Sequence, residues 1–129
     1  MRVLLDTHVF LWWVNDSPRL GREARDVISN IDNQLFLSAA SGWEIAIKAG
    51  LGKLEVADDI SSFIFEQMRL NVVDELPVLI THALHAANLP NLHRDPFDRM
   101  LIAQAQLEKL PILTGDEKFD GYPVEIIEA

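Results

Sequence analysis

The chain of 129 residues contains no cysteine. This absence excludes disulfide bonds, thiolate zinc sites and cysteine nucleophiles, and it is compatible with a reducing compartment. Basic residues are also scarce, since 11 Lys and Arg accompany 20 Asp and Glu and the net charge is −9. A surface that grips phosphates through its overall charge needs the opposite sign. If the protein handles nucleic acid, a local feature must offset its own negative field.

Long apolar runs are missing too. Val9–Val14 is one of the longest, far below the roughly 18 consecutive apolar residues of a membrane-spanning helix. Near the N-terminus, Asp6 and His8 interrupt the apolar run Val3–Leu5, so no signal-peptide core is expected there. The sequence also has no internal repeat, no low-complexity tract and no long linker rich in Gly, Ser or Pro. We therefore expect one globular domain over residues 1–129, located in the cytoplasm and without a membrane segment.

Short apolar runs alternate with longer amphipathic stretches along the chain. The sequence predicts strands at Val3–Leu5, Leu35–Leu37, Val72–Val73 and Pro111–Leu113, with a candidate edge strand at Val124–Ile127. It predicts helices over about Thr7–Val14, Leu20–Ile31, Ser41–Ala49, Asp58–Leu70, Pro77–Asn88 and Pro96–Leu110. Strands that alternate with helices are typical of a parallel sheet covered on both faces. We expect an α/β three-layer sandwich with a central, mostly parallel sheet of four or five strands.

Carboxylates follow these strands or lie at the start of the neighbouring helices. Asp6 ends the first strand, Glu44 lies near the start of the helix after the second, and Asp116 follows the fourth. Asp95 and Asp98 flank the start of the helix before the fourth strand. Ligands of such folds bind outside the carboxyl ends of the strands, where these acids are expected to meet. Crowded carboxylates repel one another, and a hard cation such as Mg²⁺ or Mn²⁺ relieves that repulsion and suits phosphodiester hydrolysis.

Each acid also has a purely structural explanation. Asp6 fits a cap of the helix that follows it, and Asp95 fits a cap followed by a proline in the first turn. Ser41 and Glu44 fit a capping box, and Glu44 also has the i,i+4 spacing for an ion pair with Lys48. Capping gives no reason for acids from separate segments to share one edge of the sheet. The metal site explains that coincidence better.

Four segments, in order and spanning most of the chain, carry a family resemblance. They are Leu4–His8 with Leu11 and Trp12, Ser38–Lys48 with Gly52–Leu54, His93–Arg99 with Leu101–Ala105, and Leu113–Asp116 with Phe119 and Tyr122. Together they resemble the motifs of the PIN-domain nucleases, and they are most similar to those of the VapC toxins of type II toxin–antitoxin systems.

The resemblance implies a PIN-like fold and a Mg²⁺- or Mn²⁺-dependent ribonuclease that acts as a toxin. The catalytic and metal-binding positions of the family correspond to four acids, which are Asp6, Glu44, Asp98 and Asp116. Supporting positions beside the site correspond to Asp95, Thr7 and Thr114. The resemblance also implies an antitoxin protein whose tail neutralises the toxin. A homodimer is expected as well, through the apolar helices between Asp58 and Asn88.

Basic residues near these motifs are candidates for holding the phosphates of an RNA substrate. They are Lys48, Lys53, Arg94, Arg99 and Lys118. The alternative is a solvated side chain or, for Arg99, an ion pair with a neighbouring acid.

Other functions stay open at this point. A phosphatase with Asp6 as covalent nucleophile usually has a second Asp two residues on, where this chain has His8. A non-catalytic binding module with the same fold is favoured by the net charge of −9, which opposes RNA binding. His82 and His85 have a spacing compatible with zinc ligation, but no third soft ligand follows. For His8 and His93 we expect packing or hydrogen-bonding roles.

Overall fold

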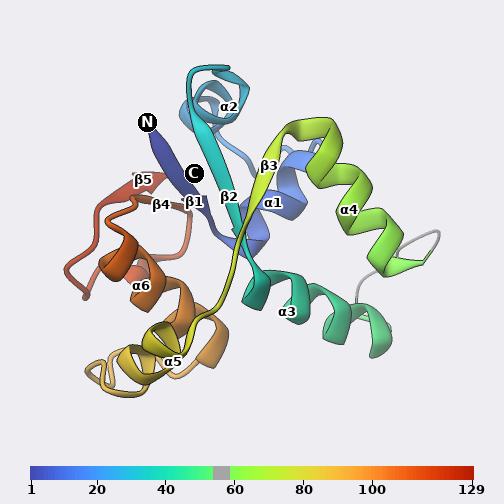
Figure 1. The fold of residues 1–129 in the computed structure, drawn as a ribbon. Helices are drawn as coiled ribbons and strands as arrows, with labels where there is room; N and C mark the ends of the chain where they lie inside the picture. Colours follow the sequence, from blue (N-terminus) through green and yellow to red (C-terminus); the bar gives the residue numbers. More distant parts are fainter. Residues whose placement is uncertain (54–58) are drawn as a thin grey trace.

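The computed structural model describes residues 1–53 and 59–129, which contain a five-stranded parallel sheet (Figure 1). The strands are β1 (Arg2–Leu5), β2 (Gln34–Ser38), β3 (Val73–Leu76), β4 (Ile112–Thr114) and β5 (Ile126–Glu128). They lie in the order β3-β2-β1-β4-β5. The chain builds outward from β1 to β3 and then places β4 on the other side of β1. The space between the carboxyl ends of β1 and β4 is therefore the topological switch point, where ligands of such sheets bind.

Helices cover both faces of this sheet. They are α1 (Thr7–Val14), α2 (Arg22–Ser29), α3 (Ala39–Gly50), α4 (Ile60–Asn71), α5 (Ile80–Ala87), α6 (Pro96–Glu108) and a short 3₁₀ helix at Glu117–Phe119. The predicted α/β three-layer sandwich is confirmed, with all of its strands parallel. Within the described ranges, no helix has both the length and the apolar character needed to cross a membrane.

Alternation along the strands divides the core between the two faces. Val3 and Leu5 of β1 pack with residues of α1, α2 and α3, among them Phe10 and Ile45. Leu4 points to the other face and packs with residues of α5 and α6, among them Leu101. Strands buried on both faces appear in the sequence as continuous apolar runs. This explains why short apolar segments were sufficient to predict the sheet.

Some element boundaries differ from the expected ones. The second helix ends at Ser29 and leaves Ile31 95% exposed. The third strand begins at Val73, because Val72 has a φ of 53° and forms the left-handed C-cap of α4. The expected helix start at Asp58, like Leu54 of the second motif, lies outside the described residues. Asp59 caps α4 by accepting a hydrogen bond from the Ser62 amide at 3.0 Å.

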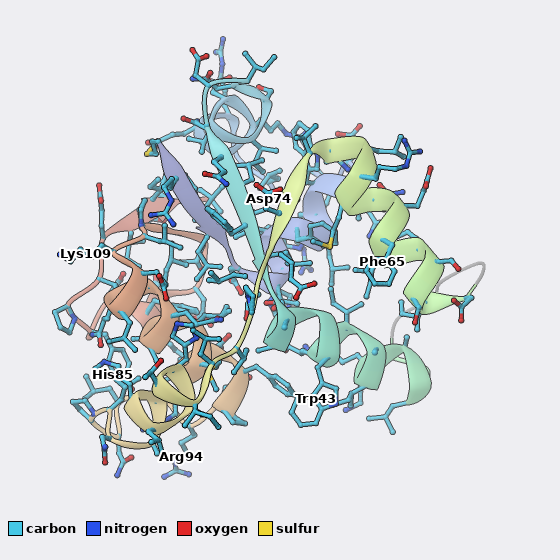
Figure 2. The ribbon with its side chains drawn as sticks, viewed as in Figure 1. Trp43, Phe65, Asp74, His85, Arg94 and Lys109 are labelled. Carbon is cyan, nitrogen blue, oxygen red and sulfur yellow. The ribbon has the colours of Figure 1, made fainter. Side chains whose placement is uncertain are left out.

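Two phenylalanines provide a matched test of this packing. Phe10 on α1 is fully buried, whereas Phe65 on α4 is 69% exposed (Figure 2). We expect Phe10→Ala to lower the free energy of unfolding by about 3–5 kcal/mol, because it leaves a cavity in the core. Phe65→Ala should change it by about 0.5 kcal/mol or less. Urea denaturation followed by circular dichroism measures both, and equal losses would contradict the place of α1 in the core.

Candidate metal centre

A threonine joins the two strands at the switch point. Thr114, the last residue of β4, donates a hydrogen bond from Oγ1 to Asp6 Oδ2 at 2.8 Å. The same Oγ1 accepts a hydrogen bond from the Asp116 amide at 3.0 Å. The backbone amide of Asp6 donates to the Leu113 carbonyl at 3.0 Å. Thr114 therefore orients Asp6 and shapes the turn that carries Asp116.

Asp6 occupies the N-cap position of α1, but its carboxylate makes no capping hydrogen bond. Helix capping, the alternative explanation for this side chain, is therefore wrong. Its Oδ1 atom is buried and has no hydrogen-bond partner. Burial raises the pKa of Asp6, and the nearby carboxylate of Glu44 adds to the rise, while the hydrogen bond from Thr114 opposes it. One carboxylate oxygen of Asp6 is thus fixed by the Thr114 hydroxyl, and the other has no hydrogen-bond partner.

The helix that carries Glu44 starts earlier than expected. Ser38 is the N-cap of α3 and accepts a hydrogen bond from the Ala40 amide at 3.1 Å. The predicted capping box of Ser41 and Glu44 is therefore wrong, because Ser41 lies inside the helix. Ser41 instead accepts a hydrogen bond from Thr7 Oγ1 at 2.8 Å, which links the start of α1 to α3. The earlier start places Glu44 in the second turn of α3.

Glu44 is buried, and its two carboxylate oxygens differ. Oε2 lies 2.8 Å from Lys48 Nζ, which confirms the predicted i,i+4 ion pair. Oε1 is buried without a hydrogen-bond partner. Lys48, a candidate for RNA contact, is therefore already paired with an acid of the site.

The start of α6 contributes two acids with different roles. Asp95 caps the helix by accepting hydrogen bonds from the amides of Phe97 at 2.8 Å and Asp98 at 3.3 Å, as predicted. Asp98 follows in the first turn. The pKa of Asp98 is raised to about 8, mainly by burial and further by four nearby carboxylates, those of Asp95, Asp6, Glu44 and Asp116. All the acids singled out in the sequence therefore lie within electrostatic reach of Asp98.

A histidine that was not in the predicted ligand set lies closest to this acid. His93 Nε2 is 2.8 Å from Asp98 Oδ2 and 4.0 Å from Asp116 Oδ2. One ligand atom from each of these three residues falls within 4.8 Å of the others. In the described part of the chain, Asp6 and Glu44 join no group this tight. The available signal was the position of His93 two residues before Asp95, in the third motif.

Three acids of the site share one arrangement. Each has a donor beside one carboxylate oxygen: Thr114 beside Asp6, Lys48 beside Glu44 and His93 beside Asp98. Buried carboxylate oxygens without a partner cost free energy. Divalent hard cations bind such oxygens, and a cation also offsets the mutual repulsion of the acids. The residues present therefore fit a divalent metal ion.

An open cleft of about 510 Å³ gives access to this cluster. Its lining residues are His8, Leu92, His93, Arg94, Asp95, Asp98, Asp116 and Lys118. Arg94 and Lys118 are exposed here, so the cleft has two positive groups although the whole chain is acidic. Lys53 is exposed at the end of α3 and does not line the cleft.

Arg99 has a structural role that the sequence did not reveal. Its guanidinium donates hydrogen bonds to four backbone carbonyls, those of Ala86, Leu89, Pro90 and His93, at 2.8–3.3 Å. The ion pair with a neighbouring acid, considered as an alternative to RNA contact, is therefore wrong. These bonds engage the guanidinium and fix the loop that leads from α5 to His93.

The two histidines considered for zinc have separate protein partners. His82 Nδ1 accepts a hydrogen bond from the Leu79 amide at 2.9 Å, and its Nε2 lies 2.9 Å from Glu108. His85 Nε2 lies 2.6 Å from Gln106 Oε1. Their geometry is that of contacts between α5 and α6, as expected when no third ligand follows.

A parallel α/β sheet with carboxylates at its switch point places the chain in the class of α/β proteins that have an acidic site at the strand ends. Within that class, the family model of the PIN domain matches residues 3–125. The chain therefore belongs to the PIN domain family, as its four motifs indicated.

Individual relatives agree with this assignment. Ribonuclease VapC22 of Mycobacterium tuberculosis (strain ATCC 25618 / H37Rv) is 30% identical over 121 residues, which cover 93% of this chain and 91% of the relative. Ribonuclease VapC16 of the same strain is 38% identical over 72 residues, and this match spans 53% of the chain and about half (51%) of that relative. DNA-bound VapBC from Salmonella typhimurium shares the fold, with a TM-score of 0.73, 16% identity, and coverage of 99% of this chain and 98% of that chain.

The raised pKa of Asp98 predicts how pH acts on the metal-free protein. Between about pH 4 and pH 8 the folded chain keeps a proton on Asp98 that the unfolded chain has released, so stability falls as the pH rises through this range. Asp98→Asn removes the buried charge. In EDTA at pH 8.5 we expect the melting temperature of this variant to be higher than that of the wild type. The difference between the two melting temperatures should become smaller toward pH 5.

Scanning calorimetry at the two pH values tests this, with Asp26→Asn on the exposed side of α2 as the matched control. The control should follow the wild type at both pH values. A gap between Asp98→Asn and the wild type that does not change with pH would contradict the raised pKa.

Proposed function

We propose that this chain is a divalent-metal-dependent ribonuclease, the toxin component of a type II toxin–antitoxin system, acting in the cytoplasm. Residues 1–129 form its single functional domain. The observation that carries the proposal is the partly buried acid Asp98, which lies within electrostatic reach of Asp6, Glu44 and Asp116 at the switch point of the sheet. Kinship with proteins named ribonucleases, VapC22 above all, supports RNA as the substrate.

The four acids would hold Mg²⁺ or Mn²⁺ as metal ligands. Such an ion lowers the pKa of a coordinated water and offsets the charge that develops on a phosphate during hydrolysis. The protein's own part is to keep the ligands in position: Thr114 holds Asp6, and Lys48 holds Glu44. Asp95 supports the site by fixing the start of α6, and Thr7 supports it through Ser41.

Positive groups in the cleft would hold the substrate. Arg94 and Lys118 line the cleft beside Asp98 and Asp116, and they supply the local positive charge that the net charge of −9 requires. Lys53, exposed beyond α3, would contact a longer RNA. Arg99 and Lys48 are left out of this role, because their side chains are engaged by backbone carbonyls and by Glu44.

Two protein partners belong to the proposal. An antitoxin is supported by the VapC-like motifs and by the relative solved as VapBC. An apolar groove of about 440 Å³ beside the acidic cleft, which Trp43, Phe97 and Met100 help to line, suits such a partner. Of these residues, Trp43 projects from α3 in Figure 2. A homodimer is supported by the exposed apolar side chains of Ile80 and Leu84 on α5.

The alternatives are less well supported by the geometry. An aspartyl-phosphate mechanism needs an accessible nucleophile, but Asp6 is only 3% exposed and one of its oxygens is bonded to Thr114. A binding module without catalysis has no use for buried acids with unpartnered oxygens, such as those of Asp6 and Glu44.

Cleavage of RNA tests the proposal directly. Antitoxin-free protein with Mn²⁺ should cut a small-RNA pool into discrete fragments, and EDTA should abolish them. Asp98→Asn and Glu44→Gln should each slow cleavage by at least about 100-fold, because a lost metal ligand removes several kcal/mol of charge stabilisation. Asp26→Asn is the matched control and should cleave normally. Undiminished cleavage by Asp98→Asn would contradict the proposed centre.

The substrate cleft can be tested by binding without cleavage. In an Asp98→Asn background, Arg94→Gln and Lys118→Gln should each weaken binding of single-stranded RNA. Each should also reduce the slope of log K against log salt by about 1, because one phosphate contact is lost. Lys109→Gln is the control, since Lys109 lies exposed beyond the other end of α6 (Figure 2). If the control has the same effect as the cleft variants in fluorescence anisotropy, the cleft is not the RNA site.

A further inference from the structure

His93 is a buried polar residue of the cleft to which the proposed function gives no role. The residue lines the cleft and is only 6% exposed. Its Nε2 lies 2.8 Å from Asp98 Oδ2 and 4.0 Å from Asp116 Oδ2. No acceptor is aligned with Nε2 as a full hydrogen bond in the described structure. The atom is thus buried, unpartnered and next to two of the proposed metal ligands.

The other ring nitrogen determines which proton the ring carries. Nδ1 accepts a hydrogen bond from the backbone amide of Asp95 at 3.2 Å, so it has no proton of its own. In the neutral ring the proton is then on Nε2. The atom that faces Asp98 is therefore a donor, and it has no lone pair to offer a metal ion.

The surroundings of the ring leave it little freedom. The amide of His93 donates to Tyr122 Oη at 2.9 Å, and its carbonyl accepts from Arg99 Nη1 at 3.3 Å. The ring packs edge-on against Phe119, with centroids 5.9 Å apart and an interplanar angle of 86°. Arg99 and Tyr122 both also bond to the Pro90 carbonyl. The position of Nε2 is thus set by contacts outside the acidic cluster.

We propose that His93 is a positioning residue of the metal centre, whose Nε2–H holds one oxygen of Asp98 so that the other faces the cation. This inference rests on the proposed function. It completes the arrangement in which Thr114 holds Asp6 and Lys48 holds Glu44. The donor lies on the side of Asp98 that faces the loop before α6, and this leaves the other carboxylate oxygen for the cation. A modest rotation of the Asp98 carboxylate completes the hydrogen bond, and alignment of this kind often tightens only in the working complex.

Three substitutions of His93 distinguish the contributions of its two ring nitrogens. His93→Gln keeps a donor near the Nε2 position, His93→Asn keeps an acceptor near the Nδ1 position, and His93→Phe keeps only the ring. Loss of a residue that orients a metal ligand typically costs 10–100-fold in metal affinity. We therefore expect His93→Asn and His93→Phe to bind Mn²⁺ about 10–100-fold more weakly, measured by electron paramagnetic resonance on the full chain. His93→Gln should retain most of the affinity.

A second measurement examines the wild type alone and does not depend on variants that fold. Long-range ¹H–¹⁵N NMR of the His93 ring should show the Nε2–H form, both without metal and after addition of Mg²⁺. A ring protonated on Nδ1, or an Nε2 that loses its proton on Mg²⁺ addition, would overturn the inference in favour of direct ligation.

The outcomes also separate this inference from the proposed function. If the wild type binds Mn²⁺ and Asp98→Asn does not, the metal centre stands. Unchanged Mn²⁺ affinity in folded His93→Asn would then overturn the role of His93 alone. If the wild type fails to bind Mn²⁺, both the metal centre and the positioning role are wrong.

Discussion

Mutual repulsion between carboxylates crowded together at one edge of the sheet is the constraint on which the rest of this structure depends. Asp6, Glu44, Asp98 and Asp116 come from separate segments and converge at the edge of the sheet beside the switch point. Burial, and then the proximity of the other carboxylates, raises the pKa of Asp98 to about 8. Such a cluster is unfavourable in a metal-free chain, so the surrounding fold must hold it together. A bound cation is attracted by all of these carboxylates, so the negative charge that destabilises the metal-free chain strengthens metal binding.

The surrounding structure meets this need with donors of different kinds. A hydroxyl from β4 holds Asp6 across the switch point, and an ammonium one turn along α3 holds Glu44. An imidazole from the loop before α6 lies beside Asp98. That loop is itself fixed by Arg99 and Tyr122. The site therefore depends on backbone carbonyls and loop contacts well outside the acids themselves.

The sequence predicted the parts of this arrangement that follow from local pattern. Each of the five strands overlaps a predicted or candidate apolar run, although only Val73 of the predicted third strand lies in β3. The places of Asp6 and Asp116 just after strands identified two acids of the candidate site. The cap at Asp95 was also correct, because a proline in the first turn leaves little ambiguity about where the helix starts. The start of α3 was misjudged because Ser38 and Ser41 both have capping side chains, and only the packed structure selects Ser38.

Contacts between distant segments could not be predicted from the sequence. The carbonyls bound by Arg99 belong to residues 6–13 positions earlier. Every residue has a backbone carbonyl, so the sequence does not indicate which carbonyls are available to a distant arginine. The closeness of His93 to Asp98 and Asp116 depends on how the segment that leads into α6 lies against the turn after β4. The hydroxyl of Thr114 reaches Asp6 across 108 positions in the chain. Local pattern identified the acids, whereas tertiary packing determines what holds each of them.

The central claim is that these acids form a divalent-metal centre, and locating the ion tests it most directly. Crystals of the full chain soaked in Mn²⁺ should give an anomalous-scattering peak within ligand distance of Asp98, Asp116 and Asp6. The peak should vanish in Asp98→Asn crystals treated in the same way. A wild-type crystal that shows no peak at this edge of the sheet, or Mn²⁺ bound only elsewhere, would contradict the account.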